Sequence, residues 1–277
     1  LDKIKDFNLS ASRIFAIIKN DEFKKETFGT KHLDTIHGDF EFKDVSFRYT
    51  KEDNDVLKHL NFKVKANETV AFVGKSGAGK STMYDVTAGT ITIDGVDIKE
   101  LDKDSIRGNI TIINQNPYIF NLSIRENLML VKQDMTEKEM LEACKMACLD
   151  DFIKSLPNQY DTIIGEGGVT LSGGQKQRLA IARALVQKTE IILFDEATSA
   201  LDNETQKNIQ KAISNLQGEY TILMIAHRLS TIVDSDRILL LNDGRIEIEG
   251  THAQLLNRSD VYKKLYQTEI MKELEKI

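Results

Sequence analysis

The chain has 277 residues, of which 41% are hydrophobic and 29% charged, an ordinary composition for a globular protein with its own core. Its formal net charge of −6 argues against nucleic acid as a partner, because neutralising phosphates requires a basic face. No apolar run approaches the roughly 18 residues of a membrane-crossing helix, and the charged start of the chain lacks the apolar core of a secretory signal.

The first residues are expected to form a helix followed by a linker. Over residues 1–22, apolar side chains recur at helical spacing with Lys and Asp between them. This helix either docks on the rest of the chain or is the tail of a helix descending from a membrane. Residues 23–37 are polar and aperiodic and indicate a linker. Because the sequence starts at Leu1 rather than Met, we expect it to be a piece of a longer protein.

Strands and helices are expected to alternate along the rest of the chain, which is typical of an α/β fold. The run 69–73 is short and apolar and ends before a glycine, as a buried central strand of a parallel sheet does. A long helix is expected to open at Thr136, with Glu139 three residues later forming a capping box. In chain order the patterns predict strands over 40–47, 57–64, 69–73 and 91–93, helices over 135–156 and from Ser172, a strand over 191–194, a helix over 203–216, a strand over 221–225, a hairpin turning at 242–244 and a C-terminal helix.

The two cysteines, Cys144 and Cys148, lie four residues apart in the predicted helix over 135–156, which would place them on one face. With no histidine or further cysteine nearby, a metal site is not expected there. We expect two buried thiols in a reducing compartment.

A glycine-rich loop after the apolar strand fits the phosphate-binding pattern G-x-x-x-x-G-K-[ST] at every fixed position. The loop and the residue after it are Gly74, Lys75, Ser76, Gly77, Ala78, Gly79, Lys80, Ser81 and Thr82. Its glycines let successive N–H groups point into one concavity, and the following helix start adds its positive end. Lys80 can reach the β- and γ-phosphates of ATP, and the Ser81 hydroxyl can bind Mg²⁺. The alternative is a merely flexible glycine loop.

A second strand, 191–194, ends in two acidic residues, Asp195 and Glu196. Asp195 is placed to bind the hydration shell of Mg²⁺. Glu196 lies one residue further on, where a carboxylate can orient and deprotonate water. An apolar run followed by Asp-Glu is a weak signal alone, but it is strong when paired with a phosphate loop.

The segment 171–178 reads Leu-Ser-Gly-Gly-Gln-Lys-Gln-Arg, which has no role in generic phosphate-loop enzymes. Ser172 and the two glycines after it could cap a helix and present bare N–H groups to an anion. The alternative is a simple helix cap. Taken with the two preceding motifs, the sequence resembles the ABC ATPase family from about Asp39 to Leu256.

The resemblance implies that ATP is shared between two chains. In that family the signature of one subunit closes over the γ-phosphate held by the phosphate loop of the other. By resemblance Ser172, Gly173, Gly174 and Gln175 would bind a partner's ATP.

Four further residues take roles by the same resemblance. Tyr49 matches the aromatic residue that stacks on adenine, and Gln115, in Asn-Gln-Asn-Pro, matches the glutamine that touches Mg²⁺ and senses the transmembrane partner. Asp202 matches the loop that crosses the dimer interface and contributes to the ATP site. His227 matches the switch histidine that contacts the γ-phosphate and holds the attacking water with Glu196. Alternatively, Tyr49 is an ordinary strand tyrosine and His227 a core histidine.

The implied fold is a phosphate-loop α/β core with an N-terminal antiparallel β subdomain and an inserted α-helical subdomain over about 117–180, within an ATPase domain over 38–277. Two segments are similar to the exporter, subfamily B-like, branch. One is 162–168, which contains Glu166; the other comprises Phe120 and residues 123–127.

We therefore expect an ATP- and Mg²⁺-dependent motor domain of an ABC exporter at the cytoplasmic face of a membrane. The expected partners are a second ABC ATPase domain, identical or different, and the transmembrane domain of the transporter. The alternatives are an ATP-binding domain with impaired turnover and a soluble ABC ATPase without a transport role. The latter would call for a coiled-coil insertion or a second nucleotide domain, and this sequence has neither.

The sequence departs from the family pattern after the phosphate loop. Only Met83 separates Thr82 from Tyr84, where the family has a long apolar helix, so about seven residues, or two helical turns, are absent. Either the natural protein carries these residues, or the deletion is real and weakens nucleotide binding. The mass of the intact protein decides, because the printed sequence corresponds to 31.3 kDa.

Overall fold

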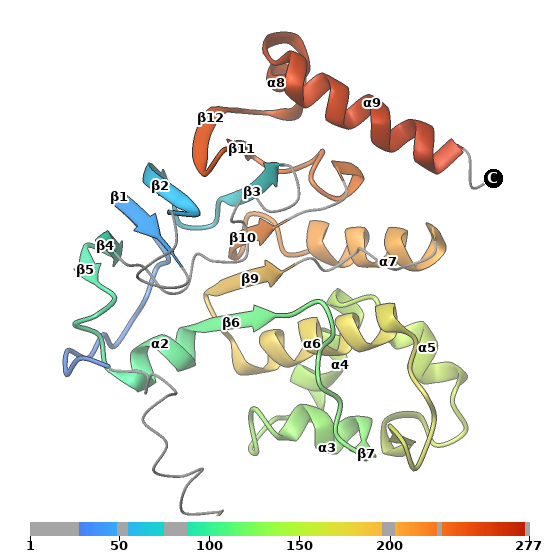
Figure 1. Cartoon of the computed structure of the whole chain (residues 1–277). Helices are drawn as coiled ribbons and strands as arrows, with labels where there is room; N and C mark the ends of the chain where they lie inside the picture. The colour runs from blue at the N-terminus through green and yellow to red at the C-terminus, as the bar shows by residue number, and fades with distance from the viewer. Residues whose placement is uncertain (1–27, 49–54, 75–87, 196–202, 226–228, 275–277) are drawn as a thin grey trace, which may run out of the picture.

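The structure is a computed structural model that describes residues 28–48, 55–74, 88–195, 203–225 and 229–274 (Figure 1). The described residues form two main sheets and a set of helices gathered beside the larger sheet. The helix predicted over 1–22 and the first part of the predicted linker lie outside the described residues.

The smaller sheet is antiparallel and four-stranded, in the order β2-β1-β4-β5. Its strands are β1 (Phe40–Phe47), β2 (Leu57–Val64), β4 (Ala88–Ile93) and β5 (Val96–Asp97). Alternate side chains such as Phe40 and Phe42 are buried, which confirms the prediction from hydrophobic alternation. The turn between β4 and β5 has positive φ at both Asp94 and Gly95, as a tight two-residue hairpin requires.

The larger sheet has six strands in the order β12-β11-β3-β10-β9-β6. These strands are β3 (Thr69–Gly74), β6 (Ile110–Ile113), β9 (Ile191–Asp195), β10 (Thr221–Ile225), β11 (Arg237–Asn242) and β12 (Arg245–Gly250). All neighbours pair in parallel except β11 and β12, whose hairpin turns at Asp243 and Gly244 as predicted.

Both faces of the larger sheet are covered, so its inner strands are apolar throughout. In β3, Val70 and Phe72 face the smaller sheet and pack with its phenylalanines. Ala71 and Val73 join the core shared with the helices. This two-sided burial explains why β3, β9 and β10 are continuous apolar runs instead of alternating ones.

The described residues contain eight helices, and the four that lie between β6 and β9 in sequence form one part of the molecule beside the sheet (Figure 1). The eight helices are α2 (Lys103–Asn109), α3 (Ile124–Met129), α4 (Glu137–Met146), α5 (Asp150–Ser155), α6 (Gly173–Gln187), α7 (Asn203–Ser214), α8 (His252–Arg258) and α9 (Asp260–Leu274), with 3-10 turns η2 (Gln159–Asp161) and η3 (Leu229–Thr231) and a small sheet of β7 (Leu122–Ser123) and β8 (Ile163–Ile164). The capping box predicted for Thr136 and Glu139 is present at the start of α4.

The single helix predicted over 135–156 is wrong, because the chain breaks it into α4 and α5. Cys148 adopts a left-handed φ of 53°. The Leu149 N–H bonds the carbonyl of Cys144 at 2.9 Å, and the Cys148 N–H bonds that of Lys145 at 3.0 Å. This pair of bonds is a Schellman motif, which ends a helix by satisfying its last carbonyls.

The break also changes the expectation for the two cysteines. Cys144 is buried in α4, and burial raises the pKa of its thiol to about 12. Cys148 lies beyond the end of α4 and is only half-buried. The two thiols therefore do not share a helix face, and only one of them is fully buried.

Residues 28–36, in the predicted linker, run beside the loop before α2. The Lys31 N–H donates to the carbonyl of Glu100 at 2.9 Å, and the Asp102 N–H donates to the carbonyl of Lys31 at 2.9 Å. Ile36 is buried against the smaller sheet. The described part of this segment is thus packed on the domain.

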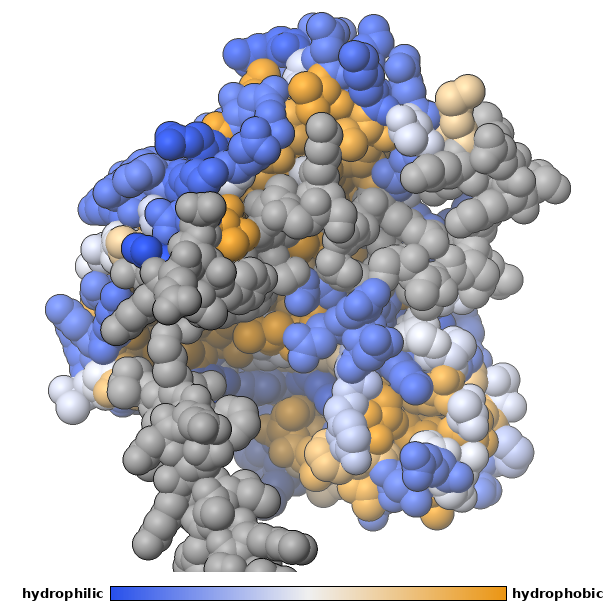
Figure 2. Space-filling view, in the orientation of Figure 1, coloured by the Kyte–Doolittle hydropathy of each residue, from blue (hydrophilic) through white to orange (hydrophobic). Residues whose placement is uncertain are grey.

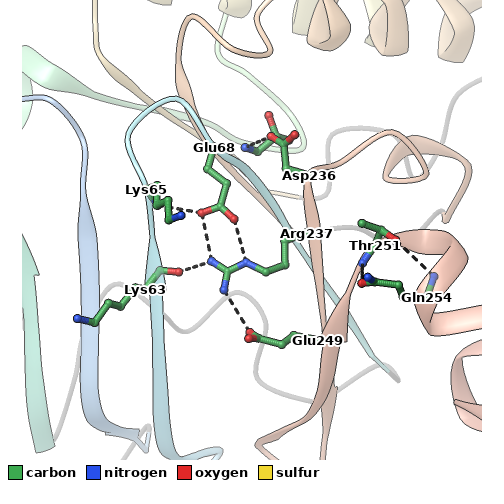
Figure 3. Close-up of polar contacts among 9 residues, drawn as sticks. Lys63, Lys65, Glu68, Asp236, Arg237, Glu249, Thr251 and Gln254 are labelled. Atoms are coloured by element: carbon green, nitrogen blue, oxygen red, sulfur yellow. Dashed lines mark hydrogen bonds and ion pairs between the residues drawn. The ribbon is translucent and has the colours of Figure 1, made fainter. Parts of the chain in front are cut away.

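An ion-pair cluster joins the amino end of β3 to the start of β11 (Figure 3). Arg237 Nε lies 2.9 Å from Glu68 Oε1, and its Nη1 lies 3.3 Å from Glu249 Oε2. Arg237 also donates to the carbonyl of Lys63. Because this cluster lies at the end of β3 opposite Gly74, it stabilises the sheet far from the edge where the motifs gather.

Candidate functional site

The carboxyl ends of the parallel strands meet at one edge of the larger sheet. Gly74 ends β3, Asp195 ends β9, and Ile225 of β10 pairs with both Phe72 and Asp195. In open α/β sheets, ligands bind outside this edge. The structure therefore brings the ends of the phosphate-loop strand and of the acidic strand to the place where a nucleotide would lie.

Gly74 is required by a close approach of two strands. A Cβ atom built on it would lie 2.5 Å from the carbonyl oxygen of Leu241 in β11. The first glycine of the predicted loop therefore allows β3 and β11 to pack side by side.

Several predicted site residues lie outside the described residues, namely Tyr49, Lys75, Ser76, Gly77, Ala78, Gly79, Lys80, Ser81, Thr82, Glu196, Asp202 and His227. Their roles remain predictions. The phosphate loop follows β3 directly, Glu196 follows β9, and His227 follows β10 by two residues. Chain connectivity thus leads all three segments away from the same sheet edge.

Gln115 lies two residues after β6, a strand that the sequence patterns do not predict. Ile113 of β6 pairs with Phe194 of β9, so Gln115 follows a strand end next to that of Asp195. Gln115 is exposed, and its main-chain carbonyl accepts a hydrogen bond of 3.2 Å from Gln177 Nε2. Gln177 is 3% exposed and was missed by the sequence reasoning. The sequence feature that could have identified Gln177 is a polar residue among the apolar residues that form the buried face of a helix.

The signature residues form the start of α6, as predicted. Ser172 is the N-cap: its hydroxyl accepts from the N–H of Gln175 at 3.3 Å, and the Gln175 side chain accepts from the N–H of Ser172 at 2.8 Å. Ser172 and Gly173 are exposed. The N–H groups of the first turn have no carbonyl partner within the helix, so this end favours an anion.

Gly174 is buried for a different reason. A Cβ atom on it would lie 1.8 Å from Thr205 Cγ2 of α7. It lets the start of α6 pack against α7, whose first residue, Asn203, follows the predicted interface residue Asp202. Ser172 and Gly173 thus lie on the helical part of the molecule, whereas Gly74 and Asp195 end strands of the sheet.

The two exporter-like segments lie side by side. Leu122–Ser123 pair with Ile163–Ile164, and the Gly167 N–H donates to Asn121 Oδ1 at 3.2 Å. Here large apolar residues are exposed: Tyr118 by 73%, Ile163 by 53% and Phe120 by 44%. Figure 2 shows apolar surface over this helical part of the molecule. A patch of this kind marks a binding surface.

The backbone under this apolar patch is held by Arg183 of α6, which the sequence patterns did not indicate, and by Asn127 of α3, which ends the exporter-like segment 123–127. Arg183 Nη1 donates to the carbonyl of Tyr118 at 2.7 Å, and its Nε donates to that of Asn127 at 3.0 Å. Asn127 accepts from the N–H of Phe120 at 3.2 Å and donates to its carbonyl at 3.0 Å. Burial lowers the pKa of Arg183.

None of the helices in the described ranges combines the length and the apolar character that crossing a membrane requires. Among the same residues, no group of three or more His, Cys, Asp or Glu side chains is placed to hold a metal ion.

Comparisons with known proteins agree with these features. The "ATP-dependent lipid A-core flippase" of Salmonella paratyphi A is 43% identical over 261 residues, covering 91% of this chain and 44% of the flippase. A Staphylococcus aureus protein whose name describes a multidrug export ATP-binding/permease protein is 42% identical over 260 residues, covering 91% of this chain and 45% of that protein.

A solved structure described as a bacterial Atm1-family ABC exporter with ATP bound matches with a TM-score of 0.82 and 38% identity, covering 96% of this chain and 47% of that chain. The chain spans a little less than half the length of the curated relatives it matches. Residues 57–199, more than half of the chain, match the family described as ABC transporter. The chain therefore belongs to the ABC transporter family.

Proposed function

We propose that this chain is the ATP-binding and ATP-hydrolysing motor domain of an ABC exporter. The observation that carries this proposal is the meeting of the ends of β3, β9 and β10 at one sheet edge, with an exposed signature helix start on a separate helical part. The relatives named for export, and the exporter structure, favour this function over that of a soluble ABC ATPase.

In this proposal ATP lies at the carboxyl edge of the larger sheet, with Tyr49 stacked on adenine and residues 74–82 around the phosphates. Ser81, Gln115 and Asp195 offer hydroxyl, amide and carboxylate oxygens, the hard donors that Mg²⁺ prefers. Mg²⁺ would neutralise charge on the phosphates. Gly74 packs closely against β11 at the end of β3. This position is consistent with a glycine that ends the strand and begins the phosphate loop.

Hydrolysis is a phosphoryl transfer to water, so the protein contributes mainly positioning and charge stabilisation. Glu196 orients the attacking water and accepts its proton. His227 holds the same water and contacts the γ-phosphate. The support is their position in the sequence, because Glu196 follows β9 directly and His227 follows β10 by two residues.

The signature residues act on the ATP of a second ABC ATPase domain, identical or different, in a head-to-tail dimer. The support is that Ser172 and Gly173 are exposed at a helix start, with first-turn N–H groups available to an anion. Asp202 directly precedes α7, the helix against which Gly174 packs, and in this proposal it belongs to the same interface.

The transmembrane domain docks on the apolar patch of Tyr118, Phe120 and Ile163, at the cytoplasmic face of the membrane. Exposed aromatic and apolar side chains next to one another suit a permanent partner. Gln115 and Tyr118 lie three residues apart in one loop. The proposed Mg²⁺ ligand and a proposed docking residue therefore belong to the same short segment. ATP-driven closure and opening of the dimer then drives export.

The test is phosphate release by the wild type beside Glu196→Gln. We expect the substitution to lower the turnover rate by about a hundredfold or more, because general-base catalysis contributes on the order of 10²–10⁴. The matched control is Glu190→Gln, an exposed residue just before β9 at its opposite end, which should keep wild-type turnover. Equal phosphate release from the wild type and Glu196→Gln would contradict the catalytic role.

A further inference from the structure

The segment that follows the switch histidine is held by the C-terminal helix. The 3-10 turn η3 begins at Leu229, two residues after His227. Leu229 is 3% exposed, and its N–H donates to Glu269 Oε2 of α9 at 2.7 Å. A charged acceptor on a buried N–H makes a strong hydrogen bond, and a buried N–H without an acceptor is costly.

A second contact reaches the same turn from α7. Gln206 Nε2 donates to the Ser230 hydroxyl at 2.6 Å, and Gln210 donates to the carbonyl of Ser230. Gln206 is 5% exposed and lies four residues after Asp202. One turn therefore receives bonds from the helix that follows Glu196 and Asp202, and from a helix at the other end of the domain.

Helix α9 is itself fixed two turns before Glu269. Tyr262 is fully buried, and its hydroxyl lies 2.8 Å from His252 Nδ1 of α8. Residues seven apart lie on the same helix face, so the contacts that fix Tyr262 also fix the direction in which Glu269 points. Glu269, Ser230 and Gln210 line one cavity of about 230 Å³ between α9, η3 and α7. The Leu229 side chain packs in the apolar core, and the polar contacts from α9 and α7 add to this packing in fixing the position of η3.

We propose that Glu269 is a positioning residue for ATP hydrolysis: through the Leu229 N–H it fixes the segment that carries His227. The inference rests on the proposed function, since it gives His227 its role at the γ-phosphate. It assigns to the C-terminal helix a part in the chemistry, although α9 belongs to none of the ATP-binding motifs.

The kinetic test compares Glu269→Ala, Glu269→Gln and Glu269→Asp in the 277-residue chain, with Gln267→Ala, an exposed residue on α9, as the control. We expect Glu269→Ala to lower kcat for ATP by about tenfold to a hundredfold, because small misplacements of reacting groups cost this much. The KM for ATP should change less than about twofold. Glu269→Gln keeps an acceptor oxygen and should restore kcat to within about threefold of the wild type.

Glu269→Asp keeps the charge on a shorter side chain, so it should lower kcat even if Glu269→Ala does not fold. Hydrogen exchange at the Leu229 amide should quicken in Glu269→Ala and Glu269→Asp, and remain slow in Glu269→Gln and Gln267→Ala. Wild-type kcat in Glu269→Ala, or an equal loss in Glu269→Ala and Glu269→Gln, would overturn the proposal. A wild type that releases no phosphate would overturn the proposed function, and the exchange rates would then still test the Glu269 contact.

Discussion

Two glycines near the site are required because a neighbouring atom leaves no room for a side chain. Gly74 and Gly174 are each required by a neighbour, the Leu241 carbonyl and the Thr205 methyl respectively. The sequence assigned both glycines to phosphate binding. The structure adds that they bring a strand and a helix start close to their neighbours.

Replacing Gly174 by alanine should therefore destabilise the protein. The added Cβ would lie 1.8 Å from Thr205 Cγ2 and 3.3 Å from Thr205 Cβ, so the Thr205 side chain or the packing of α6 on α7 must shift. We expect a loss of about 1–3 kcal/mol in the free energy of unfolding, the usual cost of overpacking. Urea unfolding followed by circular dichroism measures it. Gly108→Ala in α2 is the control, because no atom lies within 4 Å of its added Cβ. Equal stability of the two variants would contradict the packing role.

The Arg237 cluster predicts a second effect on stability. Arg237→Lys keeps the charge but cannot bond both Glu68 oxygens, Glu249 and the Lys63 carbonyl together. We expect a loss of about 1–2 kcal/mol in unfolding free energy, as for hydrogen bonds between charged groups that are only partly buried. The measurement is the Tm from differential scanning calorimetry. The control, Arg245→Lys at an exposed position in β12, should keep the wild-type Tm. A wild-type Tm for Arg237→Lys would show that the cluster adds nothing.

Among single residues, the sequence was most informative where chemistry is local. The capping boxes at Thr136 and Ser172 depend on residues three apart, and both are present. Gln177 and Arg183 were missed because their partners, Gln115 and Tyr118, lie more than sixty residues away. No local pattern contains such a pair.

Among the elements, the segment 28–36 and the start of α2 make a contact that depends on pH. His32 Nδ1 lies 2.8 Å from Asp102 Oδ2. The hydrogen bond to Asp102 raises the pKa of His32. Hydrogen bonds from the side chain and backbone of Ser105, then from His32, lower the pKa of Asp102 to about 2.

The signs define a window for this contact. The stability that the folded state gains from charged His32 is complete below the unfolded histidine pKa of about 6.5. It is lost as pH rises through the raised pKa of His32 in the folded protein. The stability that the folded state gains from ionised Asp102 is complete above the unfolded aspartate pKa of about 3.9. It is lost as pH falls toward the lowered pKa of Asp102 in the folded protein. The contact should thus be strongest between these two pH values. In an NMR titration, Asp102→Asn should lower the midpoint of the His32 ring; an unchanged midpoint would contradict the pairing.

The elements that the sequence missed are short. The strands β5, β7 and β8 have two residues each and β6 has four, too few to show a period. Their places depend on partners far along the chain, as β6 pairs with β9. The error over 135–156 has a related cause: Cys148 ends α4 in a left-handed conformation, without the glycine that usually signals such an end.

At the scale of the whole molecule, the α/β class and the parallel sheet were predicted from the pattern of apolar residues, and the antiparallel sheet was implied by the family resemblance; all three are confirmed. The order β12-β11-β3-β10-β9-β6 could not be predicted from periods alone, because each inner strand is an apolar run that could pair with any other. Dimer formation likewise depends on surfaces that no pattern within one chain contains.

The proposed dimer gives a prediction of its own. With ATP, Glu196→Gln should form a dimer in light scattering, because ATP bound between two chains is then not hydrolysed. Adding Ser172→Arg should abolish that dimer through steric conflict at the partner's γ-phosphate, while the affinity of the single chain for ATP changes less than about threefold, or about 0.7 kcal/mol. A single chain at all ATP concentrations in Glu196→Gln would contradict the head-to-tail arrangement.

Helix α6 joins the two surfaces for which different partners are proposed. Eleven residues separate the exposed cap at Ser172 from Arg183, which holds the Tyr118 carbonyl, a span of about 16 Å along a straight helix. A tilt of about 10° about one end would displace the other end by about 3 Å. If the transmembrane domain docks on the loop that carries Tyr118, as proposed, a push on this loop is transmitted along the rigid helix α6 to Ser172, which faces the other chain's nucleotide in the proposed dimer.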